Sequence, residues 1–215
     1  MRRAVLLLLL GAAASLPLPA AAAPSFTVSL PAAADLGLPF WCDWGYDWEE
    51  RCYRDDGPRL PVGGADGKVW RSALRFPISR LPGGAEVLDA RLELHHDGTC
   101  IAPRLGERPC GELGYVLDVH RILSKSWTSE REVDFDPHVL DASVVLAGWT
   151  PQRLSWNVTG LARAWHEKLA RNDGLLVKLQ DGDEDYGYGG PYLASTSHPS
   201  AEARPRLVVT YTTPG

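Results

Sequence analysis

Short runs of alternating apolar and polar residues recur along this chain, separated by glycine, proline and aspartate. Side chains alternate between the two faces of a β-strand, so such runs predict strands with one buried face. The runs are residues 25–30, 69–78, 87–94, 115–122, 154–158, 174–179, 192–195 and 207–211. In the run 87–94, the pattern places Val87, Leu92 and Leu94 on one face of the strand and Ala90 on the other face. Many short strands with turn residues between them predict an all-β protein, an antiparallel β-sandwich or jelly roll.

One segment departs from this pattern and predicts a short helix at about 159–170. Leu161, Trp165 and Leu169 recur every four residues and form an apolar stripe, which must pack on another part of the protein. His166 falls on the opposite, polar side of the helix. We therefore expect a helix that covers one open end of the sandwich and buries its stripe there.

The start of this helix carries residues suited to capping it. Asn157 or Thr159 can accept hydrogen bonds from the first free amide hydrogens. Asn157-Val158-Thr159 also matches the glycosylation sequon, although the capping role explains the same residues. Trp156, directly before the cap, and Trp165 are expected in the core.

Five strings in the second part of the chain carry a resemblance to a known family. They are Trp70–Ile78 followed by Leu81–Ala85, Trp156–Leu161 followed by Ala164-Trp165, Gly174–Lys178, Tyr192–Ser195 and Pro205–Tyr211. Taken in this order, they resemble a DNRLRE-type domain. The resemblance implies a jelly-roll β-sandwich of the carbohydrate-binding-module type, found on secreted and surface proteins of bacteria and archaea. It implies that the protein binds a glycan.

The chain departs from that family in three places. The literal six-letter signature is absent, residues 42–52 replace an open beginning rich in asparagine and glycine, and residues 100–110 look like an insertion between two strands. These departures affect the expected ligand more than the expected fold.

The first residues have the pattern of a secretory signal peptide, residues 1–22. Two arginines precede an apolar stretch, and Ala20 and Ala22 satisfy the small-residue rule for cleavage after Ala22. The apolar stretch is short and is interrupted by Pro17 and Pro19, so we expect no membrane span. The sequence therefore predicts a secreted, extracellular protein.

The remaining chain divides into two parts that we expect to form one domain. Residues 23–66 hold an N-terminal strand and a Trp-rich segment closed by a disulfide, and residues 67–215 hold the sandwich. A net charge of −5 gives no basic surface for nucleic acid.

Four cysteines are expected to form two local disulfides, Cys42–Cys52 and Cys100–Cys110. Each pair brackets a loop rich in glycine, proline or charged residues, and exported proteins keep disulfides. The alternative is a zinc site, which the absence of C-x-x-C spacing disfavours.

The sequence offers no catalytic constellation, so we predict that the protein is not an enzyme. No G-x-S-x-G motif is present, and Asp118 with His120 has no evident nucleophile to activate. His95 and His96 are adjacent, so on a strand they point to opposite faces and do not easily bind one metal ion. We read residues 95–98 as a turn at the end of a strand.

The candidate ligand-binding residues lie in the Trp-rich segment, which we define as residues 40–48. They are Trp41, Asp43, Trp44, Asp47 and Trp48. Pyranose rings stack on indoles, and carboxylates accept hydrogen bonds from sugar hydroxyls. The alternative is a satellite core, in which the indoles pack against the sandwich.

A second candidate site is the acidic sequence at Asp181, Asp183 and Asp185. Alternating carboxylates beside a glycine suit calcium. The twelfth position of an EF-hand loop would require glutamate but holds Tyr192, and strands are expected on both sides. The alternative is a solvated hairpin connection. No other cofactor is expected.

These observations lead to two hypotheses about function. The first is a secreted, non-catalytic module that binds a cell-surface or matrix glycan. The second is a structural or self-associating extracellular protein with no small ligand. Exposure of Trp41, Trp44 and Trp48 would distinguish them.

Overall fold

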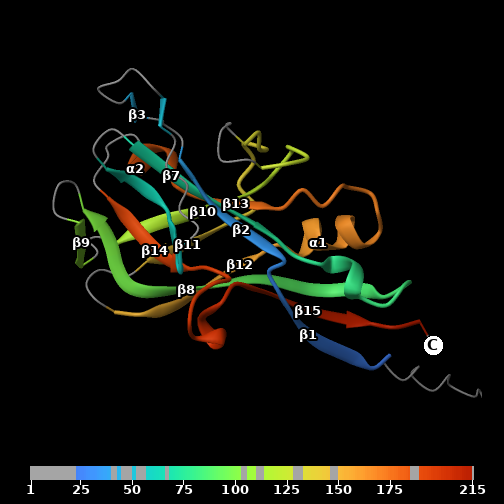
Figure 1. Ribbon diagram of the computed structural model, residues 1–215. Helices are drawn as coiled ribbons and strands as arrows, with labels where there is room; N and C mark the ends of the chain where they lie inside the picture. The colour runs from blue at the N-terminus through green and yellow to red at the C-terminus, as the bar shows by residue number, and fades with distance from the viewer. Residues whose placement is uncertain are drawn as a thin grey trace, which may run out of the picture.

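The computed structural model is a two-layer β-sandwich (Figure 1), and it confirms the predicted all-β fold. It describes residues 23–39, 43–44, 50–51, 57–65, 68–102, 106–109, 114–127, 133–145, 150–184 and 189–214. Every strand pair among these residues is antiparallel. The predicted signal peptide lies outside the described residues.

The first layer, sheet A, has seven strands. They are β1 (Ser25–Pro31), β15 (Arg206–Thr212), β8 (Glu86–Ala102), β14 (Gly190–Ala194) and β5 (Arg59–Pro61) in spatial order, with β12 (Gln152–Asn157) and β9 (Gly106–Pro109) also paired to β8. A 3-10 turn, η2 (Ala201–Ala203), precedes β15.

The second layer, sheet B, has six strands. They are β11 (Asp141–Val145), β10 (Tyr115–Arg121), β13 (Leu175–Leu179), β7 (Lys68–Arg75) and β2 (Ala34–Pro39) in spatial order, with β6 (Gly63–Ala65) also paired to β7. A separate ladder joins β3 (Asp43–Trp44) to β4 (Glu50–Arg51).

Strand β8 contains a bulge near its start that the alternating pattern did not predict. Val87 pairs with Tyr211 and Asp89 pairs with Thr210, so Leu88 is an extra residue and is exposed. The extra residue reverses the alternation, and both Val87 and Ala90 are buried in the core. The expectation that Ala90 faces away from Val87 and Leu92 is therefore wrong.

Residues 95–98 are part of the interior of β8, so the predicted strand-end turn is also wrong. His96 pairs with Gln152 of β12 on one side and with Leu193 of β14 on the other, and these partners extend the strand. The two histidines do point to opposite faces. His96 is fully buried, with Nδ1 2.9 Å from the Tyr192 carbonyl oxygen, whereas His95 is half-buried.

The main core fills the space between the sheets and includes Trp156 and Trp165, as predicted. Trp156 on β12 is fully buried, and its Nε1 donates a hydrogen bond of 3.0 Å to the carbonyl oxygen of Leu117 on β10. This bond joins the two sheets and satisfies the only polar atom of the indole.

Helix α1 (Thr159–His166) leads from sheet A to sheet B at the end where β8 begins (Figure 1). It packs on β8 and on η1 (Ile78–Arg80). The Arg163 guanidinium donates to the Val87 carbonyl oxygen at 2.8 and 3.1 Å, and Thr159 Oγ1 accepts from the Ala90 amide at 2.9 Å. The helix thus satisfies backbone groups on both sides of the bulge.

The predicted cap and stripe of α1 are confirmed in part. The N-cap residue is Val158, which makes no side-chain cap bond, although Asn157 Oδ1 before it accepts a hydrogen bond of 3.0 Å from the Thr159 amide. Leu161 and Trp165 are buried as predicted. Leu169, however, is 77% exposed, so its predicted burial is wrong. The helix ends at His166 and Lys168 has a φ of 61°, a left-handed conformation typical of helix ends, which turns the chain away before Leu169.

Candidate functional site

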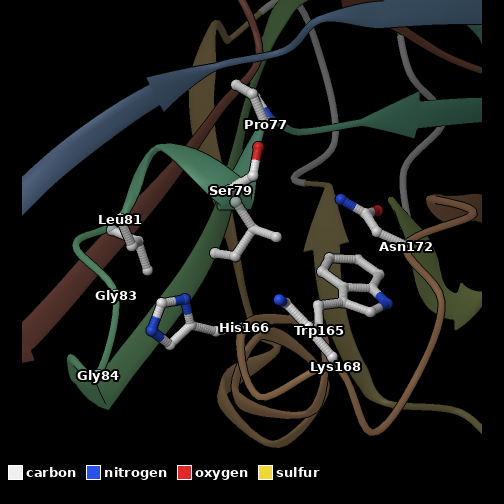
Figure 2. Close-up of a pocket in the computed structure, with 10 residues that line it drawn as sticks. Pro77, Ser79, Leu81, Gly83, Gly84, Trp165, His166, Lys168 and Asn172 are labelled. Carbon is white, nitrogen blue, oxygen red and sulfur yellow. The ribbon is translucent and has the colours of Figure 1, made fainter.

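A pocket of about 630 Å³ lies between α1 and the turn that precedes β8 (Figure 2), and we call it the α1 pocket. Its apolar wall is formed by Pro77, Ile78, Leu81 and Trp165. Its polar groups come from Ser79, His166, Lys168 and Asn172. Leu81 and His166 lie on one side of the pocket, and Trp165 and Asn172 on the other (Figure 2). A volume in this range suits a small organic ligand.

The walls of the α1 pocket are held by backbone and side-chain contacts. Asn172 Nδ2 donates a hydrogen bond of 2.7 Å to the Phe76 carbonyl oxygen. The opposite rim is a turn closed by the Ala85 amide, which donates to the Pro82 carbonyl oxygen at 3.1 Å. Gly84 in this turn has a φ of 76°, which glycine adopts without strain. The pocket is therefore formed before any ligand enters.

Two side chains of the pocket wall have hydrogen-bonding atoms without partners. Trp165 Nε1 and Asn172 Oδ1 are both closed off from solvent and have no hydrogen-bond partner. A buried polar atom left in this state costs about 1–3 kcal/mol. Because neither atom has accessible surface, both lie in the packed wall behind the pocket and not on its open surface.

A second polar cluster lies on the outer face of sheet B, and we call it the charged row. Asp118 of β10 pairs in register with Lys178 of β13. Arg71 of β7 follows on the next strand, since its neighbour Ser72 pairs with Val177. Asp118 is 8% exposed and Lys178 is 1% exposed. Buried charges at this depth need partners.

Helix turn α2 (Asp181–Glu184) supplies most of those partners. Lys178 Nζ donates to the Leu179 carbonyl oxygen at 2.8 Å and to Asp181 Oδ1 at 2.5 Å, and it lies 3.4 Å from Glu184 Oε2. Arg71 binds both carboxylate oxygens of Glu184, at 2.9 and 2.8 Å. This network neutralises the two cations on the outer face.

Burial shifts the pKa values of the two other ionisable groups on this face. Desolvation raises the pKa of the Asp118 carboxyl, while the nearby His120 and Lys178 oppose that rise. Desolvation also lowers the pKa of His120, whose Nδ1 lies 3.0 Å from the Asp136 carbonyl oxygen and whose Nε2 is buried without a partner. The outer face therefore favours a neutral imidazole. Asp118 and His120 lie two residues apart on β10 and therefore on the same face of sheet B.

Of the predicted ligand-binding residues, Asp43 and Trp44 lie in the described chain. They form β3 and pair with Arg51 and Glu50 of β4. Trp41, Asp47 and Trp48 lie outside the described residues. The two described residues of the Trp-rich segment thus belong to a ladder that is part of neither sheet.

The acidic sequence at Asp181, Asp183 and Asp185 does not form the expected hairpin connection. Asp181 and Asp183 belong to α2, and Asp185 lies outside the described residues. The segment connects β13 of sheet B to β14 of sheet A, so the expected hairpin connection is wrong. The Asp181 carboxylate is paired with Lys178, and that hydrogen bond lowers its pKa. Within the described ranges, no three histidine, cysteine or acidic residues are grouped to hold a metal ion.

The cysteines fall mostly outside the described chain. Cys100 is buried on β8, and Cys42, Cys52 and Cys110 lie outside the described residues. Strand β9 ends at Pro109, directly before Cys110, and Pro109 pairs with Thr99, the neighbour of Cys100.

No protein-family model matches the chain, and no curated protein matches it either. The described part of the chain holds no helix with the length and apolar character needed to cross a bilayer. The functional argument therefore rests on the molecule's own residues.

Proposed function

We propose that this protein is a secreted, non-catalytic module that binds carbohydrate through its Trp-rich segment. The observation that carries the proposal is the separate β3–β4 ladder, in which Asp43 pairs with Arg51 and Trp44 pairs with Glu50. Figure 1 draws β3 at the upper margin of the molecule, away from the long strands of sheet A. A ladder outside both sheets is a suitable support for side chains that contact a ligand.

Both flanks of the Trp-rich segment are anchored in the sandwich. β2 precedes it and pairs with β7 in sheet B, with Leu36 and Leu38 buried. β5 follows it and pairs with β14 in sheet A, with Leu60 buried. Fixed ends lower the cost of ordering the segment when a ligand binds.

The chemistry of the segment favours a sugar. Trp41, Trp44 and Trp48 supply flat apolar faces that match the C–H faces of pyranose rings, and Asp43 and Asp47 supply acceptors for hydroxyl hydrogens. The sandwich fold and the five strings that resemble a DNRLRE-type domain support the same ligand class.

A glycan array probed with the purified protein tests this function. We expect selective binding to a related group of glycans, and loss of that binding in the variant Trp44→Ala. The variant Leu169→Ala changes an exposed apolar residue away from the segment and is the matched control, which keeps the binding. An array without any bound glycan contradicts the proposal.

The second candidate function, self-association in an extracellular structure, is favoured by the outermost strands. β1 at one edge of sheet A carries Phe26, which is 45% exposed and stacks on Tyr211 at 5.8 Å. β11 at one edge of sheet B carries Val144, which is 55% exposed, but β12 already contacts this strand, with Gln152 Nε2 donating to the Val144 carbonyl oxygen at 3.1 Å. Unpaired strand edges with apolar residues can add further strands. Analytical ultracentrifugation tests this, because self-association makes the sedimentation coefficient rise with concentration.

Export and oxidation are part of the proposal. We expect the mature protein to begin at Ala23 and to contain the disulfides Cys42–Cys52 and Cys100–Cys110. The pairing of Thr99 with Pro109 supports the second disulfide, because it brings β9 alongside Cys100. N-terminal sequencing and non-reducing peptide mass mapping check both points, and a crossed pair such as Cys42–Cys100 contradicts the local pairing.

A further inference from the structure

Strand β1 leaves one edge of sheet A open, and that edge matches a second copy of the same strand. We propose that two copies of this protein pair β1 with β1, antiparallel and about a two-fold axis at Thr27, so that their A sheets join into one. The inference rests on self-association, the second candidate function, and it supplies the strand and the register. It is independent of glycan binding by the Trp-rich segment.

The hydrogen bonds of β1 determine which of its backbone groups are free. Ala32 and Pro205 continue the β1–β15 register, and the Ala32 amide donates to the Pro205 carbonyl oxygen at 3.1 Å. Bonded and non-bonded pairs alternate in an antiparallel ladder, so the even-numbered residues of β1 bond to β15. The backbone groups of Ser25, Thr27 and Ser29 therefore point away from β15, where β1 has no neighbouring strand within the described chain (Figure 1).

The strands at the other ends of the two sheets are short or in contact with another segment. β5 has three residues, and β11 is contacted by Gln152 of β12. On β2, the Asp35 carboxylate accepts hydrogen bonds of 2.6 Å from the amide and the hydroxyl of Thr196. β1 has seven residues, none of them charged, and its one proline is the last residue, Pro31. Short length, charge and proline commonly protect an exposed edge, so β1 is the least protected of the four.

The position of Pro31 selects the register of the pair. With Thr27 opposite Thr27, Ser25 lies opposite Ser29, and every outward amide and carbonyl of these three residues has a partner. A shift in one direction brings Pro31, which has no N–H, into a bonded pair. A shift in the other direction moves Ser29 past Ser25, the first residue of the strand. The two-fold register at Thr27 is therefore the one that satisfies the whole edge.

The side chains of β1 match on both faces in this register. Phe26 is 45% exposed and stacks on Tyr211 within its own chain, and in the pair it lies opposite the half-buried Val28 of the second copy. An aromatic residue beside a β-branched one is a favourable cross-strand pair. On the other face, Thr27 Oγ1 lies 3.0 Å from Thr210 Oγ1, and the pair extends this row of hydroxyls to the second copy. No like charges meet, because β1 has none.

Sedimentation equilibrium of the purified protein tests the inference with charge variants at the axis. Thr27→Lys and Thr27→Asp each place like charges opposite each other, so we expect each variant alone to dimerise about fivefold more weakly than the unmodified protein. An equal mixture of the two should restore dimers, because residue 27 then faces the opposite charge. Ser29→Lys mixed with Ser29→Asp is the matched control and shows no such recovery, since residue 29 faces Ser25.

A proline variant tests the free amide itself. Thr27→Pro removes an N–H that β15 does not use, and proline is tolerated on the open side of an edge strand. We expect it to weaken the dimer by about tenfold or more, because both hydrogen bonds at the axis are lost. Thr27→Ala keeps the amide and should stay within about threefold of the unmodified protein. Circular dichroism checks that each variant is folded.

Amide hydrogen exchange locates the interface directly. In dilute protein the amides of Phe26 and Val28 should be protected by β15, while those of Ser25, Thr27 and Ser29 exchange fast. Concentrated protein should protect all five. Self-association that Thr27→Pro leaves unchanged overturns the pairing of β1 and keeps the second candidate function. A protein that stays monomeric at every concentration overturns both, and the glycan array still decides carbohydrate binding.

Discussion

The two faces of sheet B are buried to a similar degree but have opposite chemistry. On β10 and β13, Leu117 and Val177 face the main core and are fully buried. Their neighbours Asp118 and Lys178 face outward and are only 8% and 1% exposed. The inner face is stabilised by removing apolar area from water, which requires shape but little direction. The outer face combines a smaller apolar cluster, which includes Ala73 and Leu176, with buried charges that need specific partners.

The two faces are therefore expected to differ in how they contribute to stability and to its pH dependence. The inner face supplies most of the stability and responds little to pH. The outer face carries ionisable groups whose pKa values are shifted by burial, so stability should depend on pH there. The charged row also engages α2, the segment where calcium was a candidate ligand.

The largest loss of stability is expected from a variant that removes the indole packed against the inner face of sheet B from β12 of sheet A. Trp156→Ala deletes a fully buried indole and its hydrogen bond to Leu117 on β10. Such deletions typically lower the free energy of unfolding by about 3–5 kcal/mol. Urea denaturation measures this change. A loss below about 1 kcal/mol would mean that the core does not depend on Trp156.

A smaller loss in the free energy of unfolding is expected from a variant of the outer face. Lys178→Met keeps the length of the side chain and removes its charge, leaving Asp181 in solvent and Glu184 paired with Arg71. We expect a loss of about 1–3 kcal/mol, because the Leu179 carbonyl oxygen loses its hydrogen bond from Lys178 Nζ. Lys125→Met at an exposed position is the control, expected within about 0.5 kcal/mol. Equal losses for Lys178→Met and Trp156→Ala would remove the contrast between the faces.

The pH dependence tests the outer face through His120. Burial lowers the pKa of His95, His96 and His120, so the unfolded chain binds protons more readily than the folded protein. Stability should therefore be complete above the unfolded pKa of about 6.5 and fall as pH decreases below it. Thermal unfolding between about pH 7.5 and about pH 5 measures this fall.

The variant His120→Gln should flatten part of that dependence, since it removes one of the three groups. Asp118 acts in the opposite direction at lower pH. Its raised pKa favours the folded protein below the unfolded value, and this contribution is lost as pH rises through the folded pKa. A melting temperature that rises from about pH 7 to about pH 5.5 would contradict the assignment of the histidines.

The smallest change in melting temperature is expected from removal of calcium. Asp181 is already paired with Lys178, whose ammonium group occupies the place that a cation would take. EDTA should therefore leave the melting temperature unchanged. A decrease with EDTA that added calcium reverses would show that Asp181, Asp183 and Asp185 hold the ion and that the charged row rearranges around it.

Local pattern predicted most strands because their inner residues follow strict alternation. β12 and β15 bury alternate residues where the sequence places them, whereas β10 buries four residues in succession because both faces of sheet B are covered. The bulge at Leu88 and the continuation of β8 through His96 depend on partners far away in the sequence, β15, β12 and β14. Alternation within one segment carries no information about such partners.

The candidate sites were likewise only partly predictable from local sequence. The sequence predicted the burial of Trp165 but gave no sign of the α1 pocket, whose walls come from residues 77–84 and 165–172. Likewise, Lys178 reads as an exposed residue within a strand, and its burial follows from α2 and the outer face. A site built from distant segments becomes visible only once the fold places them together.

Oxidative footprinting of the eight tryptophans by mass spectrometry tests the proposed function most directly. The account predicts that Trp41, Trp44 and Trp48 oxidise readily in the free protein and are protected when a glycan from the array is added. Trp156 should stay unreactive in both conditions, because it is fully buried. If Trp44 and Trp48 are as unreactive as Trp156 in the free protein, or if no glycan protects them, the Trp-rich segment is packing and the carbohydrate-binding proposal is wrong.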